Sequence, residues 1–332
     1  MAYSSGGLIA SLDYNTFAQG GASVNHAVAN INTVWGVGTG DKGYGQSSTL
    51  TPVATTTDTV TATQWATLIS RLNSILTHQA GAGSGISAPT AGTTVSYLST
   101  LSTSISTAFS NRLNSSTNAT DVTGAAPAAA SWNTATPTTF QIIRTATWAN
   151  ADQARYFFNA GGKLILTFSA TDLLTNGKGA DWVSLLGTKV ATIVIGGYSN
   201  GRTGTGGTVS ASNTGIGYWN AGTTNNSILT LTSASGTADY GTNSVAVGVK
   251  TNGVQGVNGD VGTVMTFQID LSDSAADTNT APPSLPVYSP AGTPPTQGTF
   301  NDSLNLSITT NITIRPPEIT NLPTAISNPT IA

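Results

Sequence analysis

The chain has 332 residues and a formal net charge of −3, and only 8% of its residues are charged, against about a quarter in an average soluble domain. Because few charges must lose their water on assembly, this composition suits a protein that packs against copies of itself or against neighbours. The 11 lysines and arginines are scattered, which argues against nucleic-acid binding, and the lack of cysteine excludes disulfides and thiolate nucleophiles.

The first residues, MAYSSGGLIASLDY, have neither the basic residues nor the apolar run of a secretion signal. No apolar stretch reaches the length of about 18 residues that a membrane-spanning helix needs. We therefore expect a protein that is made in a cytoplasm and does not bind membranes.

Residues 1–114 are predicted to form a helical region for attachment or assembly. Asp13 can cap a short turn with Tyr14 and Phe17, and Ser23 can cap a longer helix that ends at Gly36. The apolar stripe of that longer helix consists of Val24, Val28, Ile31 and Val34 or Trp35.

A glycine-rich stretch, GVGTGDKGYGQ, occupies positions 36–46. A phosphate-binding loop follows a buried strand and has its lysine directly before Ser or Thr. Here a helix is predicted before the glycines, and Lys42 is followed by Gly43. We therefore predict a structural loop.

Two further apolar stripes predict a pair of helices. Thr61 and Gln64 match a capping box, and Gly81 ends the first helix. The stripes consist of Trp65, Leu68, Ile69, Leu72 and Leu76, and of Val95, Leu98, Leu101, Ile105, Phe109 and Leu113. We expect an antiparallel helical hairpin, buried partly against other subunits. The residues expected to make that contact are Trp65, Leu68, Leu72, Leu98, Leu101 and Ile105.

Residues 115–139 lack periodicity and are predicted to be a linker, which Trp132 pins to a domain. Residues 140–315 contain short alternating runs, which predict strands at 140–147, 163–169, 190–195, 227–232, 245–250 and 264–271. The last predicted strand has Leu304, Leu306, Ile308, Ile312 and Ile314 inward, and residues 181–187 predict a short helix. The expected fold class is α+β, with the helical region followed by a mainly antiparallel β-sandwich of jelly-roll or immunoglobulin-like kind.

Residues 151–169, ADQARYFFNAGGKLILTFS, are expected to organise both halves of the chain. A short helix capped by Asp152 would bring the aromatic residues 156–158 into a core. Gly161 and Gly162 would supply positive φ angles, after which a strand begins with Leu164, Leu166 and Phe168 on its inward face.

Residues 316–332 are predicted to be an extended C-terminal arm, because their prolines prevent a helix. Ile319, Leu322 and Ile326 give this arm apolar side chains at spacings that suit a strip lying in a groove. We expect the arm to become ordered on another subunit.

Candidate catalytic groups are few. His26 and His78 lie in predicted helices, where a helix-face or core role is more common than a catalytic one. Glu318 is the sole glutamate, which excludes a pair of catalytic glutamates. No catalytic residue and no cofactor site is therefore predicted.

Three aspartates, Asp270, Asp273 and Asp277, cluster beside the end of a predicted strand. Carboxylates of this kind can bind a hard cation, but the neighbouring Gly and Asn residues do not follow the calcium-loop pattern. A solvated loop is the favoured interpretation, and no metal site is predicted.

Aromatic residues Tyr198, Tyr218 and Trp219 lie in loops rich in Gly and Asn. Stacking on the sugar rings of a host surface glycan is one interpretation, and structural packing of the loops is the favoured one. Arg155 beside Asp152 predicts a salt bridge within one helical turn rather than an anion site.

Three segments carry a resemblance to a known family: ARYFFNAGG at 154–162, followed by a strand; WGVGTGDKGYGQ at 35–46; and THQAG at 77–81, which ends a helix containing Trp65. They resemble segments of virion structural proteins of tailed bacteriophages, particularly contractile-tailed phages of aquatic bacteria. The resemblance implies membership of the virion rather than a mechanism, so no catalytic residue is carried over.

The resemblance thus implies a non-enzymatic component of a virion, made in the host cytoplasm, whose partners are copies of itself and other virion proteins. A neck or tail appendage, or a connecting protein, is the preferred expectation, because an attachment region is joined to a projecting region. A head decoration protein comes second. A carbohydrate-binding adhesin that uses Tyr198 and Trp219 is the alternative from a different class.

Overall fold

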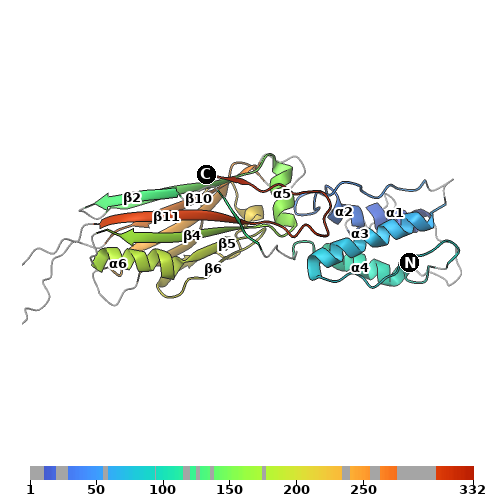
Figure 1. The fold of residues 1–332 in the computed structure, drawn as a ribbon, viewed down its shortest axis with the longest axis horizontal. Helices are drawn as coiled ribbons and strands as arrows, with labels where there is room; N and C mark the ends of the chain where they lie inside the picture. The colour runs from blue at the N-terminus through green and yellow to red at the C-terminus, as the bar shows by residue number, and fades with distance from the viewer. Residues whose placement is uncertain are drawn as a thin grey trace, which may run out of the picture.

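The computed structural model describes residues 11–19, 29–54, 59–93, 95–114, 120–124, 128–134, 138–173, 177–233, 240–254, 262–274 and 304–332. These residues form a helical region and a β region, which lie end to end along the longest axis of the molecule (Figure 1). The expected α+β fold, in which helices are followed by two antiparallel sheets, is confirmed.

Four helices make up the helical region: α1 (Ser11–Gln19), α2 (Ile31–Trp35), α3 (Ala62–Ala80) and α4 (Leu98–Ser110). Tyr14 and Phe17 of α1 are buried and pack edge-on against Trp65 of α3. Asp13 lies inside α1 and does not cap it.

The helix expected to begin after Ser23 begins at Ile31 instead. Asn30 is extended, and its side chain accepts a hydrogen bond from the N–H of Thr33, so Asn30 is the N-cap. Gly36 ends the helix as expected, whereas Ser23, Val24 and Val28 lie outside the described residues.

Both predicted ends of α3 are confirmed. The hydroxyl of Thr61 accepts a hydrogen bond from the N–H of Gln64, whose side chain accepts one from the N–H of Thr61. Gly81 adopts the left-handed conformation that ends the helix.

The two long helices pack against each other, but they run parallel and do not form an antiparallel hairpin. Gln79, near the end of α3, donates a hydrogen bond of 2.8 Å to the carbonyl of Ala108, near the end of α4. The connection from 81 to 97 folds back along α3, where the N–H of Ser84 donates to Asn73. Seventeen extended residues can cover more than the length of α3, about 28 Å, so the connection is long enough to return α4 to the start of α3.

The apolar stripes of these helices form a core of this chain and are not left for a neighbouring subunit to cover. The six residues expected to contact other subunits are all buried: Trp65, Leu68, Leu72, Leu98, Leu101 and Ile105. They are covered by α1, α2 and the connection from 81 to 97, which also contribute buried apolar side chains.

Two sheets form the β region, and every strand pair is antiparallel. The first sheet contains β1 (Val122–Thr123), β2 (Ala128–Thr134), β4 (Lys163–Asp172), β5 (Thr192–Ile195), β6 (Asn200–Arg202) and β11 (Leu304–Arg315). The second contains β3 (Thr139–Thr147), β7 (Thr208–Ser212), β8 (Asn226–Thr232), β9 (Ser244–Thr251), β10 (Val264–Ser272) and β12 (Thr330–Ile331).

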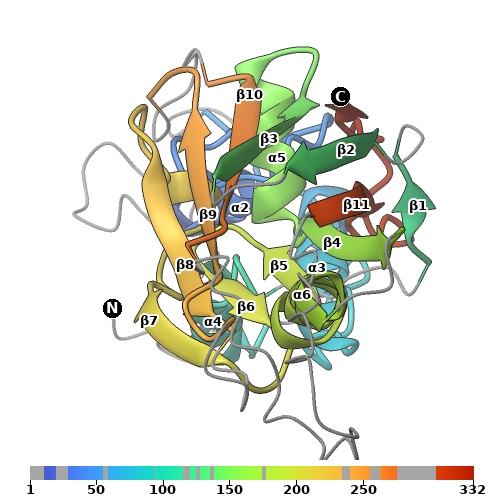
Figure 2. The ribbon, with the colours of Figure 1, turned by 90° about the vertical axis from the view of Figure 1, so that its left-hand side faces the viewer.

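The strand order is β1-β11-β4-β5-β6 in the first sheet, with β2 also paired to β11, and β12-β3-β10-β9-β8-β7 in the second. Seen from the β end, the two sheets face each other (Figure 2), and the side chains between them form one core. The inward face predicted for the last strand is confirmed, because Leu304, Leu306, Ile308, Ile312 and Ile314 are buried and alternate with partly exposed polar residues along β11.

The segment 115–139 is not a plain linker. Its residues 122–123 and 128–134 form β1 and β2, both of which pair with β11. The small side chains of β2 lack an apolar alternation, so the strand rests on its ladder to β11 and on Trp132, which stacks on Phe140 and meets Trp182 edge-on. Trp132 is the anchor that the sequence indicated.

Helix α5 (Ala151–Asn159) lies at the end of the sandwich that faces the helical region (Figure 1). Its cap is Asn150, which accepts from the N–H of Gln153, and Asp152 lies in the first turn. Aromatic residues 156–158 are buried as expected, and so is the inward face of β4, with Leu164, Leu166 and Phe168. Gly161 has the expected positive φ, at 96°, but Gly162 does not; a Cβ at Gly162 would instead lie 2.7 Å from the ring of Phe157.

At the opposite end of the sandwich lies α6 (Gly177–Ser184), which continues into a π-helix, η1 (Leu185–Val190). The helix predicted at 181–187 falls inside this longer helical segment. The strand predicted from Val190 begins only at Thr192, because Val190 ends the π-helix and Ala191 has a positive φ of 54°.

The C-terminal arm lies on its own chain. Leu322 is buried in the helical core, and β12 pairs with β3. Ile326 packs partly buried against both cores, whereas Ile319 is 49% exposed. The expectation that the arm becomes ordered on another subunit is therefore wrong for Leu322 and Ile326, since this chain supplies the apolar surface itself. The sequence between β10 and β11 contains a proline-rich stretch at 282–295, which lies outside the described residues.

Candidate functional site

The loop at 36–46 presents a group of backbone carbonyls to the β region. Four of its glycines, Gly38, Gly40, Gly43 and Gly45, have positive φ angles, which a residue with a Cβ adopts only at a cost. A Cβ at Gly43 would also lie 2.3 Å from the carbonyl oxygen of Val37. Glycine is thus required for this arrangement of carbonyls.

Arg155 of α5 binds to these carbonyls. Its Nη1 donates to the carbonyls of Val37, Gly40 and Lys42 at 2.8, 3.3 and 3.1 Å. The guanidinium also pairs with Asp152 at 3.2 Å, which confirms the predicted salt bridge. Because carbonyl oxygens attract a cation and repel a phosphate, the loop is the opposite of a phosphate-binding loop.

Asn159 lies one helical turn after Arg155 and therefore on the same face of α5. Its Nδ2 lies within hydrogen-bonding distance of the carbonyls of Gly40, Lys42 and Gly43, at 3.3, 3.2 and 3.0 Å. Arg155 and Asn159 are both buried. The two side chains bind α5 to the loop through hydrogen bonds to its backbone.

The end of α3 completes the same contact. His78 lies 3.1 Å from the carbonyl of Ala160, the residue after α5, so Nε2 carries the proton and donates it. Burial lowers the pKa of His78 to about 4, which keeps the ring neutral near pH 7. The expectation of a core histidine is confirmed for His78, while His26 lies outside the described residues.

Gln79 and Tyr44 link α4 to this contact. Gln79 donates to the Tyr44 hydroxyl and to the carbonyl of Ala108, both at 2.8 Å, and the Tyr44 hydroxyl donates to the carbonyl of Arg112. We call the loop 36–46, the end of α3 at 77–81 and α5 with Ala160 the junction. The three segments that carry the resemblance, far apart in sequence, thus meet in the junction.

The C-terminal arm spans the junction. Gln46 donates to the carbonyl of Thr324 at 3.0 Å and accepts from its N–H at 2.7 Å. The N–H of Ser327 donates to Gln153 of α5 at 2.9 Å. The arm therefore joins both regions a second time, a role that sequence reasoning missed.

The loop aromatics Tyr198 and Trp219 lie together at the edge of the junction, with ring centroids 6.4 Å apart and planes inclined by 27°. Trp219 donates its indole N–H to Asn159, and the Tyr198 hydroxyl donates to Asp41. Burial and the nearby Asp41 raise the pKa of the Tyr198 hydroxyl. Tyr198 is still 43% exposed, so the pair both packs against the junction and faces solvent.

Two of the aspartates predicted to cluster near the end of β10 bind different partners. Asp270 accepts hydrogen bonds from Gln141 and Gln268, and Asp273 pairs with Lys178. Asp277 lies outside the described residues. Within the described part of the chain, no three His, Cys, Asp or Glu residues are placed to hold a metal ion.

One serine has the spacing of a nucleophile elbow, GYSNG at 197–201, which sequence reasoning missed. That elbow is a turn from a strand into a helix. Ser199 lies instead between the antiparallel strands β5 and β6, and its carbonyl accepts from the N–H of Gly196. The geometry of an elbow is therefore absent from this serine.

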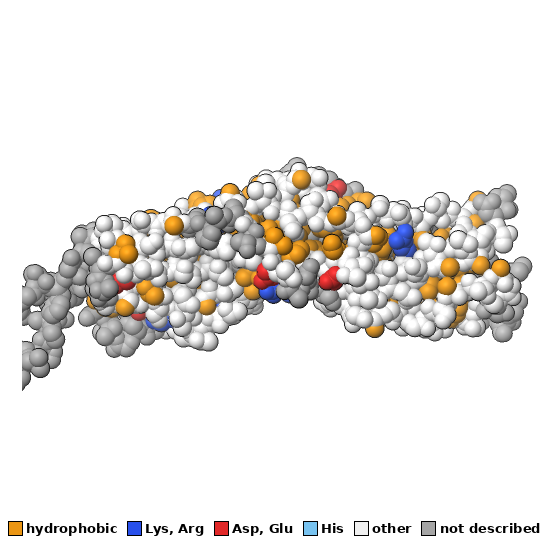
Figure 3. Space-filling view, viewed as in Figure 1, with side chains coloured by type: hydrophobic (Ala, Val, Ile, Leu, Met, Phe, Trp, Pro, Cys, Tyr) orange, Lys and Arg blue, Asp and Glu red, His pale blue; other side chains and the backbone are white. Residues whose placement is uncertain are grey.

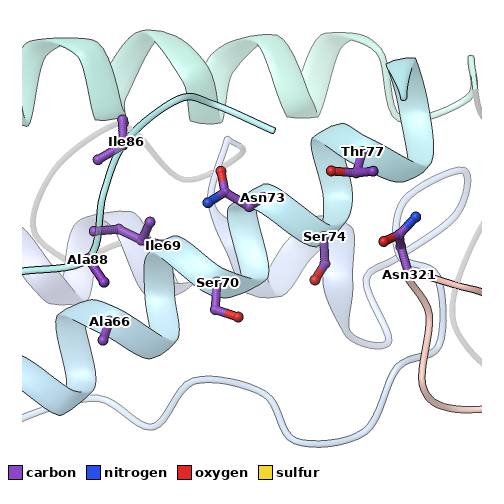
Figure 4. Close-up of a pocket in the computed structure, with 9 residues that line it drawn as sticks. All are labelled: Ala66, Ile69, Ser70, Asn73, Ser74, Thr77, Ile86, Ala88 and Asn321. Atoms are coloured by element: carbon purple, nitrogen blue, oxygen red, sulfur yellow. The ribbon is translucent and has the colours of Figure 1, made fainter. Parts of the chain in front are cut away.

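A hollow of about 330 Å³ lies on the outer face of α3 (Figure 4). It is lined by Ala66, Ile69, Ser70, Asn73, Ser74, Thr77, Ile86, Ala88 and Asn321, none of which has a titratable side chain. The hollow thus places no acid or base beside its hydroxyl groups, those of Ser70, Ser74 and Thr77, to activate them as nucleophiles.

Among the described helices, none combines the length and the apolar character needed to cross a membrane. No protein family, no curated protein and no solved structure matches the chain.

Proposed function

We propose that this chain is a structural component of a tailed-phage virion, and within the virion a neck or tail appendage or connecting protein. The observation that carries the proposal is the junction: the three segments that resemble virion structural proteins are the ones that bind the helical region to the β region. A shared sequence pattern would then reflect a shared joint rather than a catalytic site.

Two further features support this role. The regions lie end to end, as an attachment part and a projecting part would (Figure 1). The face in Figure 3 is mostly uncharged, so contacts with copies of the chain or with other virion proteins would bury few charges. The described residues bring no catalytic constellation together, and we propose a non-enzymatic role.

The test is to purify particles of the phage that encodes the chain, identify the chain in them by mass spectrometry and locate it in an electron-microscopy map. Density for both regions at the neck or tail is the expected result. Density on the head would instead support a head decoration protein, and absence of the chain from purified particles would refute the virion role.

A second candidate is a carbohydrate-binding adhesin, favoured by the exposed Tyr198 stacked near Trp219. Sugar rings bind aromatic faces of this kind. A glycan array probed with the full chain and with Tyr198→Ala separates the candidates: an adhesin loses a bound glycan on substitution, whereas a purely structural protein binds none.

A further inference from the structure

We propose that Lys178 and Asp273 condense to form an intramolecular isopeptide bond, which covalently joins α6 to the end of β10. This inference is independent of the proposed function. It starts from a buried pair at the end of the sandwich that faces away from the junction.

The two reacting groups are already in contact. Nζ of Lys178 lies 2.7 Å from Oδ2 of Asp273, and the two side chains are 2% and 0% exposed. The N–H of Asp273 donates to the carbonyl of Thr138, which fixes the residue beside the start of β3. Because the fold already holds the amine against the carboxyl group, the condensation avoids most of the entropy loss of a reaction between two separate molecules.

The surroundings favour the neutral forms that react. Transfer of a charged pair out of water is costly, and passing a proton from the ammonium to the carboxylate removes both charges. Lys178 is the second residue of α6, and the positive end of a helix disfavours a cation. Both effects favour a free amine beside a carboxylic acid.

Asn243 is placed to assist the attack of Lys178 on the carboxyl group of Asp273. With the amide of Asn243 oriented so that both neighbours are satisfied, its Nδ2 donates to Oδ1 of Asp273 at 3.0 Å, and its own Oδ1 accepts from the indole N–H of Trp182 at 3.2 Å. Asn243 and Trp182 are fully buried. The donated hydrogen bond stabilises negative charge on Oδ1 as the amine attacks, in the manner of an oxyanion hole.

The step balances without any further reactant. The ammonium of Lys178 gives one proton to Oδ2, and the Nζ lone pair then attacks Cγ, which moves the carbonyl electrons to Oδ1. Loss of a second proton from Nζ to Oδ2 and collapse of the intermediate release one water molecule. An amide with a single N–H remains between Nζ and Cγ.

A nearby ion pair provides a matched control. Nζ of Lys189 lies 3.5 Å from Oδ1 of Asp181, and it donates to the carbonyl and the hydroxyl of Ser233. Lys189 is more exposed than Lys178, at 14%. Its longer distance and its greater exposure leave it outside the proposed reaction.

The test is the intact mass of the purified full chain under denaturing conditions, with allowance for removal of the first methionine. We expect a mass lower than that of the sequence by one water molecule. Lys178→Met and Asp273→Ala should each restore the full mass, whereas Lys189→Met should keep the loss.

A tryptic digest locates the bond. Trypsin cleaves after Lys and Arg but not before Pro, and a modified Lys178 blocks cleavage, so the bond predicts a branched product that joins residues 164–189 to 251–332. An unmodified mass, or a loss of water without the branched product, would overturn the proposal. A loss of ammonia with a link to Asn243 would overturn Asp273 as the reacting group. Because the wild-type chain alone decides these outcomes, a variant that fails to fold does not weaken the test.

Discussion

Substitution of Arg155 by methionine tests whether the junction depends on its charged hydrogen bonds. Methionine keeps most of the volume but removes the donor that contacts three carbonyls. Nη1 has two protons, so at most two of its bonds to these carbonyls are strong, at about 1.5–3 kcal/mol each. Nη2 also loses its contacts with the Tyr156 hydroxyl and with Asp152, whose side chain is exposed, and an exposed pair of this kind contributes about 1 kcal/mol or less. Because Asn159 still reaches two of the carbonyls, we expect a loss of about 3 kcal/mol in the free energy of unfolding.

The matched control is Arg315→Met. Arg315 forms two hydrogen bonds to Asp121, at 2.6 and 2.9 Å, but both side chains are about a third exposed. Exposed pairs contribute about 1 kcal/mol or less. Urea unfolding of both full-length variants gives the comparison, and equal losses for Arg155→Met and Arg315→Met would refute the assignment of the junction to Arg155.

Three further substitutions test other parts of the fold. The pKa of His78 is lowered from 6.5 to about 4 in the folded chain, so the unfolded chain binds more protons between these values; unfolding free energy should fall by about 3 kcal/mol from pH 7 to 4, and His78→Gln should flatten this dependence. Gly43→Ala should cost about 1–3 kcal/mol more than Gly81→Ala, because both have positive φ but only the Cβ at Gly43 meets a backbone carbonyl. Leu322→Ala should cost about 2–5 kcal/mol, since the chain itself buries this side chain. An unfolding free energy of the wild type that does not change between pH 7 and 4 would contradict the assignment of His78. Equal losses for Gly43→Ala and Gly81→Ala would contradict the assignment of Gly43, and unchanged stability of Leu322→Ala would contradict that of Leu322.

The elements that sequence predicts well are those whose burial alternates strongly. In β11 every second side chain is buried, and all of these except Thr310 are apolar. In α3 a capping box and a left-handed glycine bound a clear apolar stripe. The spacing of the apolar residues shows which face is buried, and this spacing differs between a strand and a helix. The inward assignments of Phe168 and Ile308 are correct for this reason.

The elements that sequence misses depend on partners rather than on their own pattern. β2 consists mostly of small residues, and its strand character comes from the ladder to β11. The direction of α4 depends on the path of residues 81–97, since a connection of that length permits either orientation. The arm was expected to need another subunit because its own residues cannot say that a groove for Leu322 exists elsewhere in the same chain.

The junction was hidden for a different reason. The acceptors for Arg155 and Asn159 are backbone carbonyls more than a hundred residues earlier. Because every residue has a backbone carbonyl, the sequence does not show which ones accept these hydrogen bonds. Two signals were present in the sequence: polar donors four residues apart on a helix with three consecutive aromatic residues, and a loop rich in glycine at 36–46. Each is weak alone, and together they predict a helix face that meets a bent backbone.

A junction of this chemistry has a mechanical consequence. Apolar side chains can slide past each other at little cost, whereas hydrogen bonds weaken steeply as their angle changes. Arg155 and Asn159 therefore fix the direction of α5 against the loop, and the arm, through Gln46 and Gln153, restrains rotation at a second place. Because the arm also continues into β12, bending the helical region away from the sandwich would break hydrogen bonds at both places at once. A rigid angle between the helical region and the sandwich follows from these contacts, and the Arg155→Met variant is the change that should loosen it first.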